Sequence, residues 1–417
     1  MASAIFKTSV RLGGAAPVFL ACAAIISGSA TAETATETAA KAPPIFTPIL
    51  DTRLRYESVD QEGFAKDANA VTLRLRFGLE SRSYNGFSVL VEGEGIEGLN
   101  NDYNSTTNGR TALPVVADPD SIELNRAHIA YADADVKAVV GRQRIILDNA
   151  RFVGNVGWRQ NEQTFDAALG LLTVIPDLRL TYAYVSAVRR VFSSRNPAGK
   201  FDSDSHLVNL NYTGLWGAAF TGYGYLLDLK EAPASSTATY GLRATAPIDF
   251  AEGALLQLTG EYAFQTDYSD NAGDVDLSYF LVSIGTKFDG FDASVTHETL
   301  EGNGGVGFAT PLATLHEFQG WADVFLTTPA SGIEDRYGRI GYAFREVGPF
   351  AEIVTAAIYH DYKAEIGGGS LGNELNLLIK GVIDPKLSAT FKFATYDGPA
   401  GGPADRNKLW LQFDHKF

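Results

Sequence analysis

Apolar and polar residues alternate with a period of two along most of this chain. In residues 72–80, leucine or phenylalanine occupies every odd position, and polar residues or glycine occupy the even ones. The segments 207–213 and 374–380 alternate in the same way. A period of two is typical of β-strands with one apolar and one polar face, whereas amphipathic helices repeat every 3.6 residues. The pattern therefore predicts an all-β protein.

The alternation predicts 18 strands, separated by segments rich in Gly, Asn, Asp and Ser. The predicted strands are 49–58, 70–82, 87–98, 121–132, 136–146, 163–175, 178–189, 205–214, 217–228, 236–247, 254–267, 276–288, 291–300, 334–346, 350–362, 372–383, 387–397 and 408–417.

The connections between these strands alternate in length. Those after even-numbered strands are short, such as 83–86, 176–177 and 289–290, while several after odd-numbered strands are long, such as 99–120 and 301–333. Short periplasmic turns and long outer loops are the signature of outer-membrane β-barrels. Such a sheet must close on itself, because an open edge in hydrocarbon would leave backbone groups unpaired. The fold class predicted is a transmembrane antiparallel β-barrel over residues 49–417.

The N-terminus has the features of a secretory signal peptide. Lys7 and Arg11 form a basic region, residues 12–26 are mostly apolar, and Ala30-Thr31-Ala32 fits a small-x-small cleavage site. We expect residues 1–32 to be removed and residues 33–48 to form a periplasmic lead.

The only cysteine, Cys22, lies in this predicted signal peptide, so the mature chain would contain no disulfide. Phe19-Leu20-Ala21-Cys22 also resembles a lipoprotein cleavage site, which leaves a lipoprotein as an alternative.

Net charge narrows the possible partners. The chain carries a net charge of −15, and loss of the two cations of the signal peptide would make it −17. Nucleic-acid binding needs a basic footprint, which this charge disfavours. No other stretch has the 18 or more apolar residues of a membrane helix. The expected surroundings are outer-membrane lipid in a Gram-negative bacterium.

The last strand supports this localisation. In residues 408–417, Leu409, Leu411 and Phe413 share one face, and the chain ends on Phe417. This ending resembles the signal by which the outer-membrane assembly machinery recognises its clients, so we expect that machinery to be a partner.

In a membrane barrel the apolar face meets lipid and the polar face lines the lumen. A barrel of about 18 strands is wide enough for an aqueous channel. Aromatic residues near strand ends, such as Tyr84, Phe87, Trp216 and Trp410, are predicted to form the interfacial girdles. Ordinary β-propensity is the alternative explanation of their positions.

Arginines occur in pairs two residues apart on the predicted strands. Each pair is predicted to project into the lumen, and acids such as Glu92 and Glu94 line the same wall. Guanidinium groups match carboxylates, so the arginines could form a track for an anionic solute. A salt-bridge network that stiffens the wall is an equally supported reading. The pairs are Arg53 and Arg55, Arg74 and Arg76, and Arg142 and Arg144.

Two loops contain aromatic residues that a purely solvated loop does not need. Loop 147–162 holds Trp158 among Asn, Gln, Asp and Arg residues, and loop 301–333 holds His316 and Trp321. Aromatic rings beside such polar groups are typical of sugar contacts. The alternative is that these loops simply fold onto the barrel rim.

The chain offers little support for metal, cofactor or catalytic sites. The six histidines are scattered, with no pair at zinc-ligand spacing, and there is no G-x-S-x-G nucleophile motif. Ser294 and His297 are close in sequence, but their odd spacing puts them on opposite faces of one strand. We expect no metal, no cofactor and no enzymatic activity.

The segment "GRQRIILDNARFVGNVGWRQNEQTFDA" resembles the hallmark segment of the alginate export family of outer-membrane barrels. "PLATLHEFQGWADVF" resembles a second recurrent segment of that family. This resemblance implies an 18-stranded monomeric channel with a cationic, anion-selective constriction.

The resemblance implies solute-binding or constriction roles for Arg142, Arg144, Arg151 and Arg159, with Asp148 and Asn161 as their neighbours. The facing of the strands adds Arg74 and Arg76, and the second aromatic loop adds Trp321.

The sequence thus predicts an outer-membrane porin that passes sugar-like anionic solutes, such as uronate oligo- or polysaccharides, by passive diffusion. An outer-membrane barrel enzyme acting on lipid or polysaccharide is the alternative, and an adhesin that uses the long loops is a third possibility.

Overall fold

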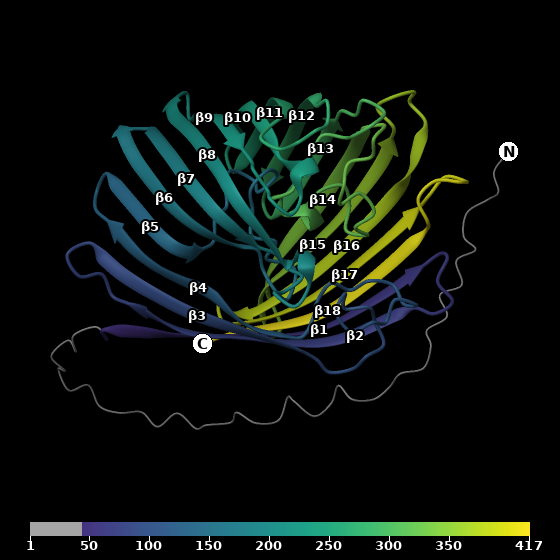
Figure 1. Ribbon diagram of the computed structural model, residues 1–417, viewed down its shortest axis with the longest axis horizontal. Coiled ribbons are helices and arrows are strands. Elements are labelled where there is room, and N and C mark those ends of the chain that lie inside the picture. The colour runs from purple at the N-terminus through teal and green to yellow at the C-terminus, as the bar shows by residue number, and fades with distance from the viewer. Residues whose placement is uncertain (1–43) are drawn as a thin grey trace. The chain divides into compact units, whose positions relative to one another are not determined.

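The computed structural model describes residues 44–417, which form one closed, 18-stranded antiparallel β-barrel. Each strand pairs with its neighbours in sequence, and β18 pairs with β1 to close the sheet (Figure 1). This confirms the predicted fold class. The predicted signal peptide, Cys22 and most of the predicted lead lie outside the described residues.

The strands are β1 (Phe46–Gln61), β2 (Ala68–Ser81), β3 (Phe87–Gly98), β4 (Ser121–Ala132), β5 (Val136–Gln143), β6 (Thr164–Ile175), β7 (Leu178–Arg189), β8 (Lys200–Leu215), β9 (Ala218–Leu226), β10 (Thr237–Ala251), β11 (Ala254–Asp267), β12 (Asp276–Phe288), β13 (Phe291–Leu300), β14 (Ile333–Val347), β15 (Phe350–Lys363), β16 (Ser370–Asp384), β17 (Leu387–Asp397) and β18 (Arg406–Lys416). Three short 3-10 helices lie in the connections, at η1 (Pro197–Gly199), η2 (Pro233–Ser235) and η3 (Leu315–Glu317).

All 18 predicted strands are present. Several, including β3 and β13, have the predicted bounds, and the connections after even-numbered strands are the short ones. The difference that matters most is β5, which ends at Gln143 instead of at residue 146. No helix within residues 44–417 is long and apolar enough to cross a membrane.

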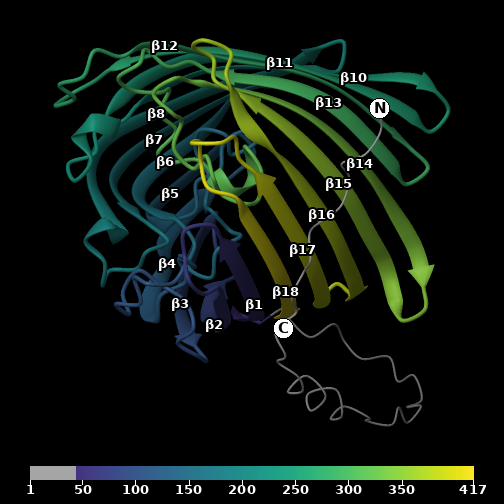
Figure 2. The same ribbon diagram turned by 90° about the vertical axis from the view of Figure 1, so that its right-hand side faces the viewer.

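The outer face of the wall is apolar. On β2, Leu73, Leu75 and Phe77 are exposed, while the alternating arginines are buried inside the barrel. Because the barrel is closed, lipid is the natural environment of these exposed side chains. Figure 2 shows the wall from the side of β10–β18. This barrel with its apolar exterior confirms the predicted outer-membrane localisation.

Large aromatic residues lie at the short-turn end of the wall, as expected for an interfacial girdle. Trp216 is 89% exposed and Tyr84 is 73% exposed. Trp410 was predicted to belong to this girdle, and this is wrong. Its side chain is fully buried inside the barrel, because it shares the inward face of β18 with Lys408 and Gln412.

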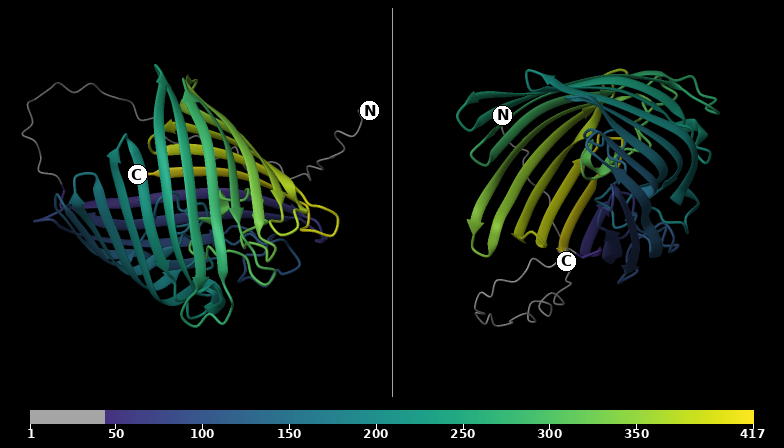
Figure 3. Two further views of the ribbon diagram at one scale, coloured as in Figure 1. Left: turned by 90° about the horizontal axis from the view of Figure 1, so that it is seen from above. Right: turned by 90° about the vertical axis from the view of Figure 1, so that its left-hand side faces the viewer.

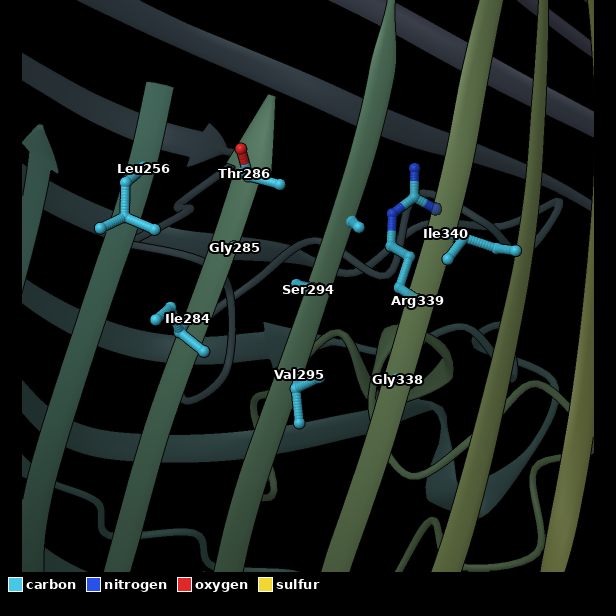
Figure 4. A pocket seen from close by; sticks show the side chains of 10 residues that line it. Leu256, Ile284, Gly285, Thr286, Ser294, Val295, Gly338, Arg339 and Ile340 are labelled. Atoms are coloured by element: carbon cyan, nitrogen blue, oxygen red, sulfur yellow. The ribbon is translucent and has the colours of Figure 1, made fainter. Parts of the chain in front are cut away.

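A shallow apolar hollow lies on the outer face of β11–β14. Its volume is about 360 Å³, and it opens over Gly338, which has no side chain. Figure 4 shows Ile284, Val295 and Ile340 around it. These residues are exposed on the lipid-facing side, so the hollow is separate from the interior of the barrel.

Two long connections fold into the barrel interior. They are residues 144–163, between β5 and β6, and residues 301–332, between β13 and β14, and we call them the inner loops. Figure 3 shows coil segments inside the ring of strands. Buried residues of both loops, such as Phe152 and Leu312, pack with inward-facing wall residues such as Tyr279. The inner loops therefore position the candidate site.

Candidate functional site

The inner loops are joined to each other by backbone hydrogen bonds. The Gly154 N–H donates to the carbonyl of Leu312 at 2.9 Å, and the Thr314 N–H donates to the carbonyl of Ala150 at 3.0 Å. The side-chain amide of Gln163 also donates to the Leu312 carbonyl, at 3.0 Å. Because the loops share these bonds, a change in the position of one loop must affect the other.

Loop 144–163 contacts the wall at widely separated strands, so it crosses the lumen. Each contact joins a polar side chain of the loop to an inward-facing side chain of the wall. The contacts are Asp148 with Asn209 of β8 at 2.8 Å, Arg151 with Glu298 of β13 at 2.7 Å, Arg159 with Glu57 of β1 at 3.2 Å, and Gln160 with Thr72 of β2 at 2.8 Å.

Two wall arginines hold the backbone of this loop. Arg53 Nη1 donates to the carbonyl oxygens of Gly157, Trp158 and Arg159 at 3.1–3.3 Å. Arg55 also donates to the Trp158 carbonyl, and its guanidinium lies 4.3 Å from the Trp158 ring centre. The five donors of a guanidinium suit such a row of carbonyls. These arginines therefore fix the path of the loop.

Asp323 is the charged centre of loop 301–332. It accepts hydrogen bonds from Lys408 Nζ at 2.6 Å, from Arg159 Nη2 at 3.0 Å and from His316 Nδ1 at 2.8 Å. Burial by itself would raise the pKa of Asp323, but Lys408 and the other donors hold it well below its usual range. One carboxylate thus ties both inner loops to β18.

Glu162 performs a similar role at the other end of loop 144–163. It pairs with Arg144 at 2.6 Å and with Arg76 at 3.5 Å, and it accepts from Asn125 at 2.7 Å. Burial opposes its ionisation, yet these partners lower the pKa of Glu162 to about 2.

Most of the arginines predicted to contact a solute are buried in ion pairs. Arg74 pairs with Asp51 at 2.6 Å, Arg76 pairs with Glu94, and Arg151 is only 1% exposed beside Glu298. A solute in the lumen has no access to such side chains. Of the two readings of the wall arginines, the structure supports the salt-bridge network at these positions.

The remaining predicted residues also make internal contacts. Asp148 is partly buried, which raises its pKa although Asn209 donates to it. Asn161 donates to the carbonyl of Arg190 at 3.3 Å. The Trp321 ring centre lies 3.7 Å from the ammonium of Lys392. These residues shape the inner loops.

Arg142 was predicted to project into the lumen, and this is wrong. It lies on the same face of β5 as Val140, which is 60% exposed, whereas Gln143 on the opposite face is buried. Its guanidinium pairs with Asp166 at 2.7 Å and donates to the carbonyl of Leu124 at 2.9 Å.

The short length of β5 explains this role of Arg142. β4 pairs with β5 only from Ala127 to Ala132. The first part of β4, residues 121–126, therefore has an edge that β5 does not cover. Unpaired carbonyls are costly in a membrane-facing wall, and Arg142 satisfies one of them. Arg144 lies beyond the end of β5, where the chain turns inward, so the two arginines do not share a strand face.

A cavity of about 420 Å³ opens between the inner loops and the wall at the long-loop end of the barrel. Arg159 is the one predicted site residue in its lining. Four cationic side chains and one carboxylate line it, with neutral residues that are mostly apolar. The charged lining residues are Arg159, Arg190, Arg406, Lys408 and Asp323, together with His316, and the aromatic ones are Phe64 and Phe192.

Two of these cations have no carboxylate within salt-bridge distance in residues 44–417. Arg190 stacks on Phe192 and Phe201 and donates to the Ala198 carbonyl. Arg406 donates to two backbone carbonyls of loop 301–332, at 3.0 and 2.9 Å. Burial lowers the pKa of Arg190 to about 10, so its guanidinium stays charged at neutral pH.

The sequence interpretation missed Arg190, Arg406 and Lys408. The signal for the last two was available, because they occupy the same face of the last strand as Trp410, Gln412 and other polar residues. Arg190 follows the end of β7, and no local pattern indicates which way its side chain points.

Possible metal ligands are dispersed in the part of the chain that the structure describes. No group of three or more His, Cys, Asp or Glu residues with metal-binding geometry occurs in residues 44–417. Ser294 and His297 lie on opposite faces of β13, as predicted, so they form no catalytic pair.

Acidification is expected to weaken the docking of the inner loops. Burial, with the charge of Lys392, lowers the pKa of His316 from 6.5 to about 3. A released loop would bind a proton below pH 6.5 that the docked loop excludes, so docking loses stability as the pH falls from 6.5 towards 3. Glu162 adds to the loss between its ordinary pKa of 4.5 and about 2.

Single-channel recordings at pH 7 and pH 4 test this prediction, with more frequent current fluctuations expected at pH 4. The variant His316→Gln should show a smaller difference between the two conditions. Identical fluctuations of the wild-type protein at both pH values would contradict it.

Comparisons with known proteins agree with this geometry. The alginate export family model matches residues 49–193, which contain most of β1, all of β2–β7 and loop 144–163. No curated protein matches the sequence.

Solved structures with the same fold include OccAB4 of Acinetobacter baumannii, with a TM-score of 0.69, 14% identity and coverage of 90% of this chain and 99% of that chain. OpdL of Pseudomonas aeruginosa has a TM-score of 0.66 and 17% identity over 89% of this chain and 99% of that chain. The outer membrane protein opdK of the same species has a TM-score of 0.67 and 14% identity, with coverage of 89% and 99%.

The resemblance found in the sequence is thus confirmed for the first of the two quoted segments, and the barrel is of the kind found in outer-membrane porins. The chain has a porin-like outer-membrane fold and carries, over residues 49–193, the sequence pattern of the alginate export family.

Proposed function

We propose that this protein is an outer-membrane channel that passes anionic, sugar-sized solutes, such as uronate oligosaccharides, by passive diffusion. The observation that carries the proposal is the cavity at the long-loop end, where four cationic side chains face one carboxylate. Its volume of about 420 Å³ lies within the roughly 300–1,000 Å³ of typical small-molecule sites.

Arg190 and Arg406 are the main recognition groups in this proposal. A guanidinium without a carboxylate partner can bind a solute carboxylate through two parallel hydrogen bonds. Phe64 and Phe192 in the same lining offer ring faces on which a sugar ring could stack. A uronate supplies both a carboxylate and an apolar ring face, so it matches the two kinds of lining group.

The paired residues beside the cavity keep binding weak enough for passage. Arg159 and Lys408 share Asp323, so a solute that approaches them competes with an existing carboxylate. Conduction requires a site that attracts the solute without holding it. The acidity of the whole chain does not prevent local anion attraction, because charges farther away than about 10 Å are screened at 0.1 M salt.

Reversal potentials in planar bilayers test the proposal. Wild-type protein should prefer chloride over potassium, and the double variant Arg190→Ala/Arg406→Ala should lower this preference about threefold or more, since it removes two unpaired cations. Arg142→Ala is the matched control, because it removes an arginine from the outer face of the wall. Cation selectivity of the wild type, or an unchanged preference in the double variant, would refute the arginine assignment.

Solute specificity needs a second measurement. Added glucuronate should reduce the chloride current of the wild type more than glucose does, and this difference should shrink in the double variant. Equal effects of the two sugars would remove the preference for carboxylated solutes. Shortened polysaccharide after incubation with the protein would favour the barrel enzyme instead.

A further inference from the structure

Three of the four tryptophans of the chain surround one lysine inside the barrel. The ammonium of Lys392, on β17, lies 3.7 Å from the ring centre of Trp321, 4.0 Å from that of Trp158 and 5.4 Å from that of Trp410. The side chain is almost completely buried. Aromatic faces attract cations, and tryptophan does so most strongly.

The three rings come from three separate parts of the barrel. Trp158 belongs to loop 144–163, Trp321 to loop 301–332, and Trp410 to β18. One wall lysine therefore contacts both inner loops at once. Glu298 of β13 also contacts both loops, through Arg151 and Gln319, whereas Lys408 on the neighbouring strand acts mainly through Asp323.

His316 adds a directed contact to this cluster. Its Nδ1 faces the carboxylate of Asp323 at 2.8 Å, so Nδ1 carries the hydrogen and Nε2 is free to accept. Lys392 Nζ donates to that Nε2 at 2.8 Å. The His316 ring also stacks parallel to Trp158, with 4.9 Å between ring centres. The lysine thus holds loop 301–332 through His316 and through Trp321.

No carboxylate forms a salt bridge with Lys392 in the described part of the chain. Of the acids near Lys392, Asp323 is paired with Arg159 and Lys408, and Glu317 lies beyond salt-bridge distance of the lysine. A buried lysine without a paired acid is rare in proteins. Its contacts are instead the tryptophan faces and the His316 ring, which link the wall to the inner loops.

We propose that Lys392 is a latch that holds both inner loops in the lumen and so limits how far the passage opens. The proposal goes beyond the proposed function, since it concerns the position of the loops whatever solute passes. Removal of the latch leaves the closed wall intact, because every strand keeps its neighbours.

Hydrogen exchange of the inner loops tests the latch without depending on transport. The informative amides are those of Gly154 and Thr314, which bond one inner loop to the other. In Lys392→Met, which fills the same space without a charge or a donor, we expect both amides to exchange about tenfold faster or more. Lys392→Arg retains a cation and donors, so it should stay closer to the wild type.

Lys380→Met is the matched control, because Lys380 occupies the inward face of the neighbouring strand β16 and makes no cation–π contact within residues 44–417. It removes the same charge from the lumen and should leave exchange unchanged. Single-channel conductance should rise about twofold in Lys392→Met and much less in the control. Equal exchange in Lys392→Met and the wild type would overturn the proposal.

Trp321→Leu covers the case in which Lys392→Met fails to form a heat-modifiable barrel in detergent. This variant removes one of the three aromatic rings around Lys392, the one that belongs to loop 301–332, and keeps the lysine. We expect faster exchange at the backbone N–H of Thr314. The change should be smaller at the backbone N–H of Gln160, because its acceptor, Asp118, lies outside loop 301–332. Unchanged exchange at Thr314 would overturn the latch.

Discussion

Replacement of Arg159 with leucine is expected to weaken the docking of loop 144–163 by about 3 kcal/mol, because it leaves buried carboxylates without a partner. Arg159 bridges Glu57 on β1 and Asp323 in loop 301–332, at 3.2 and 3.0 Å. The expected cost lies at the lower end of the range for broken buried ion pairs, since Lys408 stays near both acids.

The measurement is hydrogen exchange at the backbone N–H of Gln160, which donates to the carboxylate of Asp118. A loss of about 3 kcal/mol corresponds to exchange roughly a hundred times faster if the loop opens as a unit. Arg195→Leu is the control, because Arg195 is exposed in the connection between β7 and β8. Equal exchange in the two variants would show that Arg159 does not hold the loop.

Replacement of Gly320 with alanine is expected to displace the turn of loop 301–332 that carries Trp321. Gly320 has a φ of +82°, and a Cβ atom there would lie 2.3 Å from a carboxylate oxygen of Glu374. The positive φ costs about 1–3 kcal/mol in a residue with a side chain. The clash adds to this cost, because the same carboxylate accepts the Ala322 N–H at 2.8 Å.

Gly304→Ala separates the two contributions. Gly304 lies in the same loop with a φ of +84°, and open space surrounds the position of its Cβ. Both variants carry the backbone strain, and only Gly320→Ala carries the clash. Limited proteolysis should cut loop 301–332 faster in Gly320→Ala than in Gly304→Ala. Equal cleavage would show that contact with Glu374 does not matter.

The sequence predicted the wall well because the signal for a strand is local. Alternation over a few residues defines each strand and its apolar face, and glycine-rich and polar segments define its ends. The inward face of Arg74 and Arg76 followed directly from the exposed Leu73, Leu75 and Phe77, which alternate with them. The prediction for Arg142 was wrong because it followed the spacing of the arginines. It overlooked the apolar residues Val136, Ala138 and Val140 on the same face of the strand.

The candidate site could not be predicted in this way, because its contacts join residues far apart in sequence. Arg151 and Glu298 are separated by 147 positions, and Arg159 and Asp323 by 164. Whether an arginine is free for a solute or paired in the wall depends on which acid the fold brings to it. A guanidinium on the inward face is compatible with both outcomes.

By itself, the sequence determined the barrel: its strands, the lipid-facing side of most of them, and the two connections rich in aromatic residues. Only the tertiary structure decided that these connections fold inward and bond to each other, and that Trp158, Trp321 and Trp410 meet at Lys392. It also decided that, of the four cations lining the cavity, Arg190 and Arg406 have no carboxylate partner within residues 44–417. The physical reason is that a strand is specified by its own alternating residues, whereas the path of a long loop is specified by the buried charges and rings that it reaches across the lumen.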